Sequence, residues 1–131
     1  MPPLPHRVAA IGVDIGGTSI KVALVGPEPA VLCRRSMQMS QAENADSVLR
    51  KLSLIIDELR CEAGGAGLPV GVGCAGLIDA RGGVVRTSPN LHGWSNIPLV
   101  KLLTELGNTK VVLDNDANVF TLAEGFYGAA R

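Results

Sequence analysis

An aspartate followed by a Gly-Gly-Thr turn stands between two apolar runs near the start of the chain, and this segment restricts the fold more than any other. The first run ends at Asp14, the turn is Gly16–Thr18, and the second run continues to Val25. Two short apolar runs around a tight turn predict a pair of adjacent strands. Because glycine has no Cβ, the backbone of this turn can come close to a bulky ligand.

The turn carries groups suited to a phosphate bound together with a metal ion. The N–H groups of Gly16 and Gly17, with the Thr18 hydroxyl, form a cluster of donors for phosphate oxygens. Asp14 would repel phosphate unless a divalent cation lies between them, and Mg²⁺ bridges carboxylates to phosphates. An ordinary β-hairpin with a permissive turn has similar residues, so the turn taken alone leaves both interpretations open. It is not a Walker loop, which ends in Gly-Lys-Ser/Thr and opens a helix.

Composition and periodicity predict an α/β domain. Hydrophobic residues make up 47% of the 131 residues and aromatic residues only 3%, which favours aliphatic strands covered by helices. The order of elements predicts a mixed sheet, with an antiparallel meander followed by two parallel strands, and a small hairpin at 76–85. The expected elements are strands near 7–14, 19–26, 30–37, 69–74 and 110–114, and helices near 45–62, 98–106 and 117–126.

The ends of two of the predicted helices carry typical boundary residues. Asn44 or Asp46 is expected to cap the helix near 45–62, and Gly64 with Gly65 is expected to stop it. Pro98 is expected to occupy the start of the next helix, where its missing N–H costs nothing.

Charge and cysteine usage exclude several classes of function. The net charge is zero, so the chain offers no basic field for nucleic acid or an anionic membrane. No apolar run approaches the ~20 residues that span a bilayer. Cys33, Cys61 and Cys74 lack metal-ligand spacing and are odd in number, so we expect a reduced cytoplasmic protein with the cysteines as small buried hydrophobes. Residues 1–6 have no signal-peptide character and are expected to form a flexible tail.

A second polar cluster follows the last predicted strand. Asp114, Asn115, Asp116 and Asn118 stand where this strand enters a helix. Ligands of α/β sheets bind at the carboxyl ends of strands, where an aspartate can act as a general base. Asp and Asn are also ordinary helix caps, but a cap needs only one such residue.

Four segments together resemble the ROK family of sugar kinases and sugar-responsive repressors. They are Asp14–Thr18, Ser88–Trp94, Leu113–Asn118 and Glu124–Ala130, and their order and spacing match over residues 7–131. The resemblance implies an α/β fold, the N-terminal domain of an actin-like ATPase (ribonuclease H-like). It also implies a glucokinase-type reaction that uses ATP and Mg²⁺ to phosphorylate a hexose.

The resemblance further implies a role for individual residues. Asp116 would be the catalytic base, and Asp14 would hold Mg²⁺ through water. Lys21 occupies a variable place in the family and is given no role, and Trp94 is expected to pack its loop rather than stack on sugar. The implied phosphate loop is Gly16, Gly17 and Thr18, and the implied sugar contacts are Gly76, Asn90, Asn115 and Asp116.

The sequence departs from the family pattern in two places. Ala75 replaces the proline that often precedes the glycine matching Gly76, which would loosen the sugar loop. Residues 7–131 correspond to an N-terminal lobe only, since the chain stops at Arg131. Family kinases have a second lobe with the other phosphate loop, further sugar-binding residues and a zinc site, so zinc is expected only if such a lobe exists.

Three functions remain open at this point. The first is a hexose kinase, most simply at the sugar 6-hydroxyl, seen as its N-terminal lobe. The second is a sugar-responsive regulator, although the first strand begins near residue 7 and leaves no room before it for a helix-turn-helix region. The third is a truncated or separately encoded lobe without catalysis, which binds sugar weakly or pairs with another chain. A homo-oligomer or a missing C-terminal lobe is the expected partner. The identity of the hexose does not follow from these residues.

Overall fold

The computed structural model describes residue 8 and residues 10–26, 31–40, 43–64, 67–88, 91, 93–107 and 110–115. The elements in these ranges are β1 (Ala10–Ile15), β2 (Ser19–Val25), β3 (Val31–Gln38), α1 (Ala45–Glu62), β4 (Val70–Cys74), β5 (Leu77–Asp79), β6 (Val84–Thr87), β7 (Ser95–Ile97), α2 (Leu99–Glu105) and β8 (Val111–Asp114). The predicted tail at residues 1–6 and the predicted helix at 117–126 lie outside the described residues.

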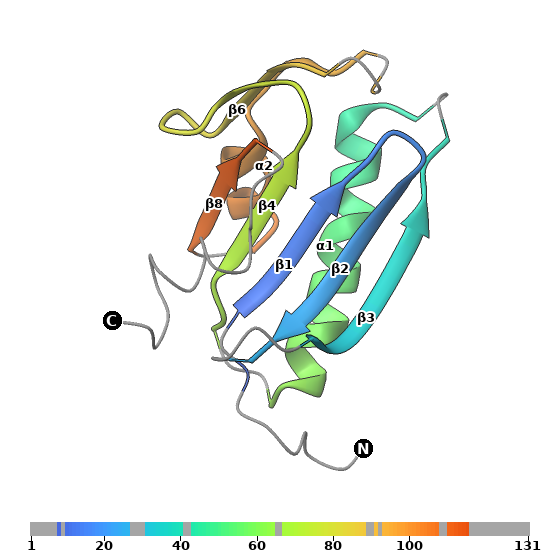
Figure 1. The fold of residues 1–131 in the computed structure, drawn as a ribbon, viewed down its shortest axis with the longest axis vertical. Helices are drawn as coiled ribbons and strands as arrows, with labels where there is room; N and C mark the ends of the chain where they lie inside the picture. Colours follow the sequence, from blue (N-terminus) through green and yellow to red (C-terminus); the bar gives the residue numbers. More distant parts are fainter. Residues whose placement is uncertain are drawn as a thin grey trace.

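Five strands form one mixed sheet in the order β3-β2-β1-β4-β8. The first three strands pair antiparallel, whereas β4 lies parallel to both β1 and β8. This arrangement confirms the predicted meander and the two predicted parallel strands. In Figure 1 the carboxyl ends of β1, β4 and β8 point toward the same edge of the sheet, where the hairpin that contains β6 lies.

Both helices cover the same face of this sheet (Figure 1). The side chain of Asn44 caps α1 by accepting a hydrogen bond from the Ser47 N–H at 2.8 Å. Every third or fourth residue of α1 is buried, as an amphipathic helix requires, and Gly64 follows its end with a φ of +93°. Pro98 precedes α2 as its cap residue instead of being its first helical residue. No helix among the described residues is long and apolar enough to cross a membrane.

The alternation of side chains along the strands separates a core face from a polar face. Val13 of β1, Val72 of β4 and Leu113 of β8 lie in register and are buried on the face that the helices cover. The next residue of each strand lies on the opposite face, because successive side chains alternate. Asp14, Gly73 and Asp114 are therefore neighbours across three strands on the polar face.

A second, smaller sheet of three short strands has the order β5-β6-β7. The β5–β6 pair is the small hairpin expected at 76–85. Strand β7 was not expected, because it has only three residues, and two of them are the polar Ser95 and Asn96. It pairs antiparallel with β6 and leads directly into α2.

Two leucines of α1 provide a matched test of this packing. Leu52 is fully buried, whereas Leu54 is 65% exposed in the same helix. We expect Leu52→Ala to lower the free energy of unfolding by about 2–5 kcal/mol, because it leaves a cavity against the sheet. Leu54→Ala should change it by less than about 0.5 kcal/mol. Urea unfolding measures both, and equal losses would contradict the helix orientation described here.

Candidate functional site

The Gly16–Thr18 turn between β1 and β2 is fixed by backbone hydrogen bonds at both ends. The Gly16 N–H donates to the Ser19 carbonyl at 3.0 Å, and the Met39 N–H donates to the Thr18 carbonyl at 2.9 Å. A Cβ built on Gly16 would lie 3.1 Å from the Ser19 oxygen, so a larger residue is accommodated only if the turn shifts. The turn is thus anchored to the end of β3 as well as to its own two strands.

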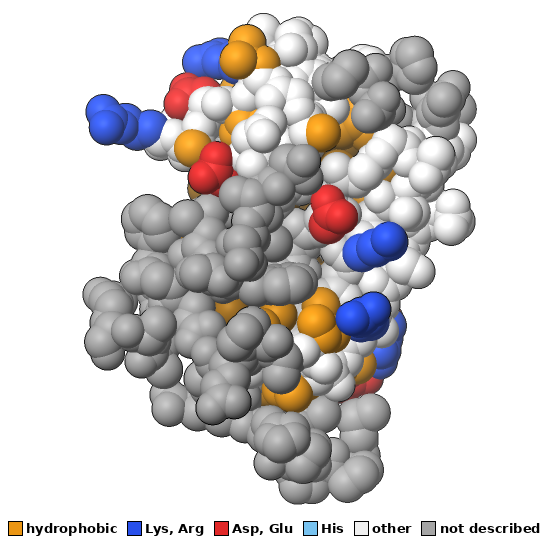
Figure 2. All heavy atoms as spheres, viewed as in Figure 1, with side chains coloured by type: hydrophobic (Ala, Val, Ile, Leu, Met, Phe, Trp, Pro, Cys, Tyr) orange, Lys and Arg blue, Asp and Glu red, His pale blue; other side chains and the backbone are white. Residues whose placement is uncertain are grey.

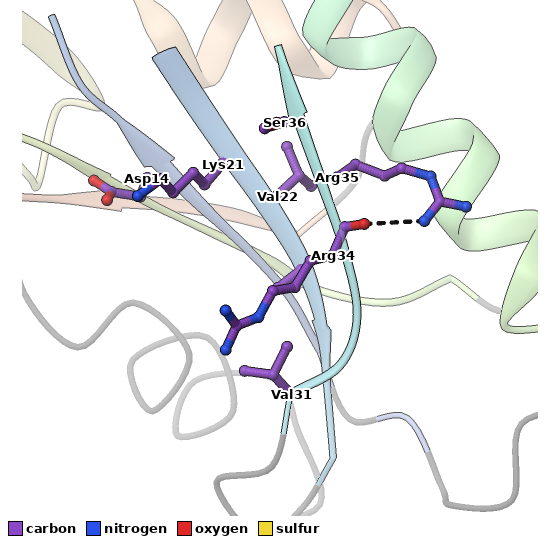
Figure 3. A pocket seen from close by; sticks show the side chains of 8 residues that line it. Asp14, Lys21, Val22, Val31, Arg34, Arg35 and Ser36 are labelled. Atoms are coloured by element: carbon purple, nitrogen blue, oxygen red, sulfur yellow. Dashed lines mark hydrogen bonds between the residues drawn. The ribbon is translucent and has the colours of Figure 1, made fainter. Parts of the chain in front are cut away.

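Asp14 lies beside this turn with its carboxylate exposed on the polar face of the sheet. Its cross-strand partner is Lys21 in β2, and Figure 3 shows the two side chains next to each other. Sequence reasoning gave Lys21 no role. The register of β1 and β2 places Lys21 beside Asp14, so a cationic and an anionic side chain are neighbours on the polar face.

A groove of about 440 Å³ runs from Asp14 across β2 and β3. Within the described residues, Lys21 and Arg34 form no ion pair, whereas Arg35 turns toward α1 and pairs with Glu62. Figure 2 shows the corresponding gathering of basic groups next to an acidic group on this face. The groove is lined by Asp14, Lys21, Val22, Ala23, Val31, Arg34, Arg35 and Ser36. Its mixed charge suits an anion that is accompanied by a cation.

The Ala75–Gly76 turn follows β4 at the same edge of the sheet. Gly76 has a φ of +125°, and a Cβ at this position would lie 2.2 Å from the Thr87 carbonyl oxygen. Both the backbone conformation and the available space therefore require glycine. The neighbouring Ser88 hydroxyl donates to the Ala75 carbonyl at 2.7 Å.

The end of β8 reaches this turn directly. The Asn115 side-chain amide donates to the Gly76 carbonyl at 2.6 Å, and the Asn115 N–H donates to the Asp114 carboxylate at 2.7 Å. The structure therefore brings Gly76 and Asn115 together, at the edge toward which Asp14 lies near the end of β1. Asn90 and Asp116 lie outside the described residues, so their positions and roles remain predictions.

The cysteines differ from the expectation that all three are buried. Only Cys74 is buried, whereas Cys33 is half-buried and Cys61 is exposed. Burial raises the pKa of the Cys74 thiol to about 11, with a smaller contribution from the charge of Asp14 and an opposing one from a hydrogen bond with Ser88. A thiol with this pKa is neutral near pH 7 and is not a nucleophile. Trp94 is 3% exposed and belongs to the core, as its predicted packing role requires.

The donor set of the described residues fits magnesium better than zinc. Mg²⁺ keeps several waters and is usually held by one or two carboxylates together with phosphate oxygens. The exposed carboxylate of Asp14, beside a turn rich in N–H donors, meets this requirement. No group of three or more His, Cys, Asp or Glu side chains in the described part of the chain is arranged to hold a metal ion by itself.

Comparison with known proteins assigns the chain to a family. Residues 10–131 match the ROK family. The chain belongs to this family. Its fold is that of the N-terminal domain of an actin-like ATPase, which is the fold of the ROK sugar kinases it matches in structure. This confirms both the fold class and the family expected from the sequence.

Two ROK relatives show the range of functions in the family. The chain is 37% identical over 126 residues to a glucokinase of Thermotoga maritima, covering 95% of this chain and 39% of the relative. It is 31% identical over 121 residues to a xylose repressor of Caldicellulosiruptor bescii, covering 90% of this chain and 30% of the repressor. The chain thus spans less than half the length of these relatives.

Solved ROK structures share the same architecture. A ROK hexokinase from Thermus thermophilus superimposes with a TM-score of 0.74 at 33% identity, covering 93% of this chain and 40% of the hexokinase. A ROK family glucokinase from Streptomyces griseus, solved in complex with glucose and AMPPNP, gives a TM-score of 0.69 at 29% identity. That match covers 94% of this chain and 38% of the glucokinase.

Two glycines test the requirement for glycine at the Ala75–Gly76 turn. Gly93 also has a positive φ, of +76°, but nothing lies within 4 Å of a Cβ built there. We expect Gly93→Ala to cost about 1–2 kcal/mol of unfolding free energy through backbone strain alone. Gly76→Ala should cost clearly more, because its Cβ meets the Thr87 carbonyl as well. Denaturant unfolding compares the two variants, and equal costs would argue against the close approach of Thr87.

Proposed function

We propose that residues 7–131 are the N-terminal lobe of an ATP-dependent hexose kinase of glucokinase type. The sugar-kinase relatives support a reaction of this class, and the glucokinase complex with glucose and AMPPNP supports hexose and a nucleoside triphosphate as its substrates. We further propose the 6-hydroxyl as the acceptor. A cytoplasmic location and the flexible tail at residues 1–6 remain predictions, and the panel of sugars described below would identify the hexose.

One observation carries the proposal: a carboxylate, a turn of N–H donors and a polar strand end share one edge of the sheet. Asp14 lies one residue before the end of β1 and the Gly16–Thr18 turn follows that strand, Gly76 follows β4, and Asn115 follows β8. The contact between Asn115 and Gly76 and the register of Asp14 with Gly73 join these elements at that edge. A phosphate donor and a polyhydroxylated acceptor would meet there.

Each residue has a distinct part in the proposed reaction. Asp116 would accept the proton of the attacking hydroxyl as a general base. Gly76, Asn90 and Asn115 would orient the sugar by hydrogen bonds to its other hydroxyls. In the Gly16–Thr18 turn, the Gly17 N–H and the Thr18 hydroxyl would donate to the phosphate oxygens of ATP, because the Gly16 N–H already donates to the Ser19 carbonyl. Lys21 would add positive charge beside them. Most of the acceleration would come from holding acceptor and donor in line.

Asp14 is the residue that would hold Mg²⁺, through water, next to the phosphate loop. The metal would neutralise charge on the transferred phosphoryl group. The positive charge of Lys21 would offset the negative charge of Asp14, so that this carboxylate would repel the phosphates less. The groove of mixed charge beside Asp14 is consistent with this arrangement.

The other two functions predict different results in one experiment. The similarity to a xylose repressor supports a sugar-responsive regulator as a second candidate. The match to only 39% of the glucokinase supports a non-catalytic lobe as a third. We would incubate the complete gene product that contains this sequence with Mg-ATP and a panel of hexoses and N-acetylated hexosamines. Phosphorylation of one sugar supports the kinase. Sugar binding without phosphorylation supports a regulator or a non-catalytic lobe.

Replacing the proposed base tests the mechanism. In the complete gene product, Asp116→Asn should leave sugar binding largely intact and lower kcat by ~10² or more, because the amide keeps the shape but cannot accept a proton. Asp57→Asn, an exposed carboxylate on α1, is the control and should keep the parent kcat. Steady-state kinetics and a binding titration measure both effects. If the Asp116→Asn variant phosphorylated the sugar at the parent rate, Asp116 would not be the base, and its interpretation as a helix cap would be favoured.

The chain by itself should not catalyse the reaction. We expect purified residues 1–131 to show no measurable hexose phosphorylation, because one wall of the cleft that aligns ATP and sugar would come from a second lobe. A coupled assay with Mg-ATP and glucose measures this, and the complete gene product serves as the positive control. Robust activity of the isolated chain would mean that a homo-oligomer supplies the missing wall.

A further inference from the structure

Two consecutive backbone carbonyls at the end of β4 each accept a hydrogen bond from a distant side chain. The Ala75 carbonyl accepts from the Ser88 hydroxyl at 2.7 Å, and the Gly76 carbonyl accepts from the Asn115 amide at 2.6 Å. These donors are 13 and 39 residues away in the sequence. The Ala75–Gly76 turn thus joins the segment after β6 to the segment after β8.

The turn itself has little freedom to move. Gly76 is held close to the Thr87 carbonyl, and its φ of +125° is one that other residues rarely adopt. On the other side, Cys74 is fully buried in β4, within the parallel part of the sheet. A group attached to this turn is therefore fixed relative to the core.

Both donors stand shortly before residues of the proposed site in the sequence. Ser88 is followed by Pro89 and Asn90, and Asn115 is followed by Asp116. Fixing Ser88 therefore sets the point from which the chain continues toward the sugar contact Asn90, and only Pro89 lies between the two. Fixing Asn115 sets the point from which the chain continues to the proposed base.

We propose that Ser88 and Asn115 are positioning residues, which set the sugar contact Asn90 and the base Asp116 relative to each other through the Ala75–Gly76 turn. This inference rests on the proposed function for the roles of Asn90 and Asp116, but not for the contacts themselves. It also revises the part played by Asn115. One of its two N–H donors is committed to the Gly76 carbonyl, so its second N–H and its oxygen are the groups left for sugar hydroxyls.

The link between the two donors is tested first in the 131-residue chain, without reference to activity. The side-chain amide signal of Asn115, assigned by its loss in Asn115→Ala, is followed by ¹⁵N NMR. We expect Ser88→Ala to move this signal, although the two residues are far apart in sequence, and Ser88→Thr, which keeps the hydroxyl, to leave it in place. An Asn115 signal unchanged by Ser88→Ala would overturn the coupling.

Thr104 in α2 is a matched control for the loss of a hydroxyl. Its side chain also donates to a backbone carbonyl, that of Val100, at 2.7 Å. Thr104→Ala should leave the Asn115 signal unchanged. An equal shift in Thr104→Ala and Ser88→Ala would mean that the effect is general and would contradict a specific link.

Kinetics of the complete gene product test the consequence for the site. Ser88→Ala should lower kcat/KM for the hexose by ~10-fold or more, since small displacements of reacting groups are costly. Ser88→Thr should restore it, and Thr104→Ala should keep the parent value. Because both donors act on one turn, the combined loss in Ser88→Ala/Asn115→Ala should be smaller than the product of the separate losses.

The outcomes separate this inference from the proposed function. If the parent protein phosphorylates a hexose and Ser88→Ala has the same kcat/KM, the positioning role is wrong and the kinase function stands. If the parent phosphorylates nothing, the kinase function fails. The NMR result then still decides whether the turn couples Ser88 to Asn115.

Discussion

The parallel pairing of β1 with β4, and of β4 with β8, is the constraint on which the rest of the structure depends. It directs three carboxyl ends to one edge of the sheet, and side-chain alternation then decides what each end presents. Val13, Val72 and Leu113 face the helices, so the next residue in each strand faces away from them. A polar strand end at this edge is thus a geometric consequence of burying the core on the other face.

The sequence predicted most of the fold because the main elements are local patterns. The apolar runs gave the strands, and the spacing of leucines and isoleucines gave α1. Strand β7 was not predicted because Ser95 and Asn96 are not typical strand residues. They form a strand because they pair with β6. The exposure of Cys61 was missed for a related reason, since composition does not tell which side of a helix a cysteine occupies.

The candidate site was predictable only as a set of residue types. The Asp14 turn could be recognised because its parts are adjacent in sequence. The hydrogen bond between Asn115 and Gly76 joins residues 39 positions apart, and no local sequence pattern predicts it. Sequence reasoning therefore assigned Asn115 to the sugar, whereas the structure commits part of its amide to the backbone. The position of Lys21 beside Asp14 was likewise not predicted, because it depends on strand register.

The position of β1 at the centre of the sheet has a consequence for how the protein folds as it is made. The short Gly16–Thr18 turn joins β1 directly to β2. The other neighbour of β1 in the sheet is β4, which begins only at Val70. Closing the longer loop costs more entropy, so the meander and α1 can form while the parallel strands are still absent. Strand β8 is synthesised later still. Its docking completes the polar edge, so this edge forms only after Asp114 has been synthesised.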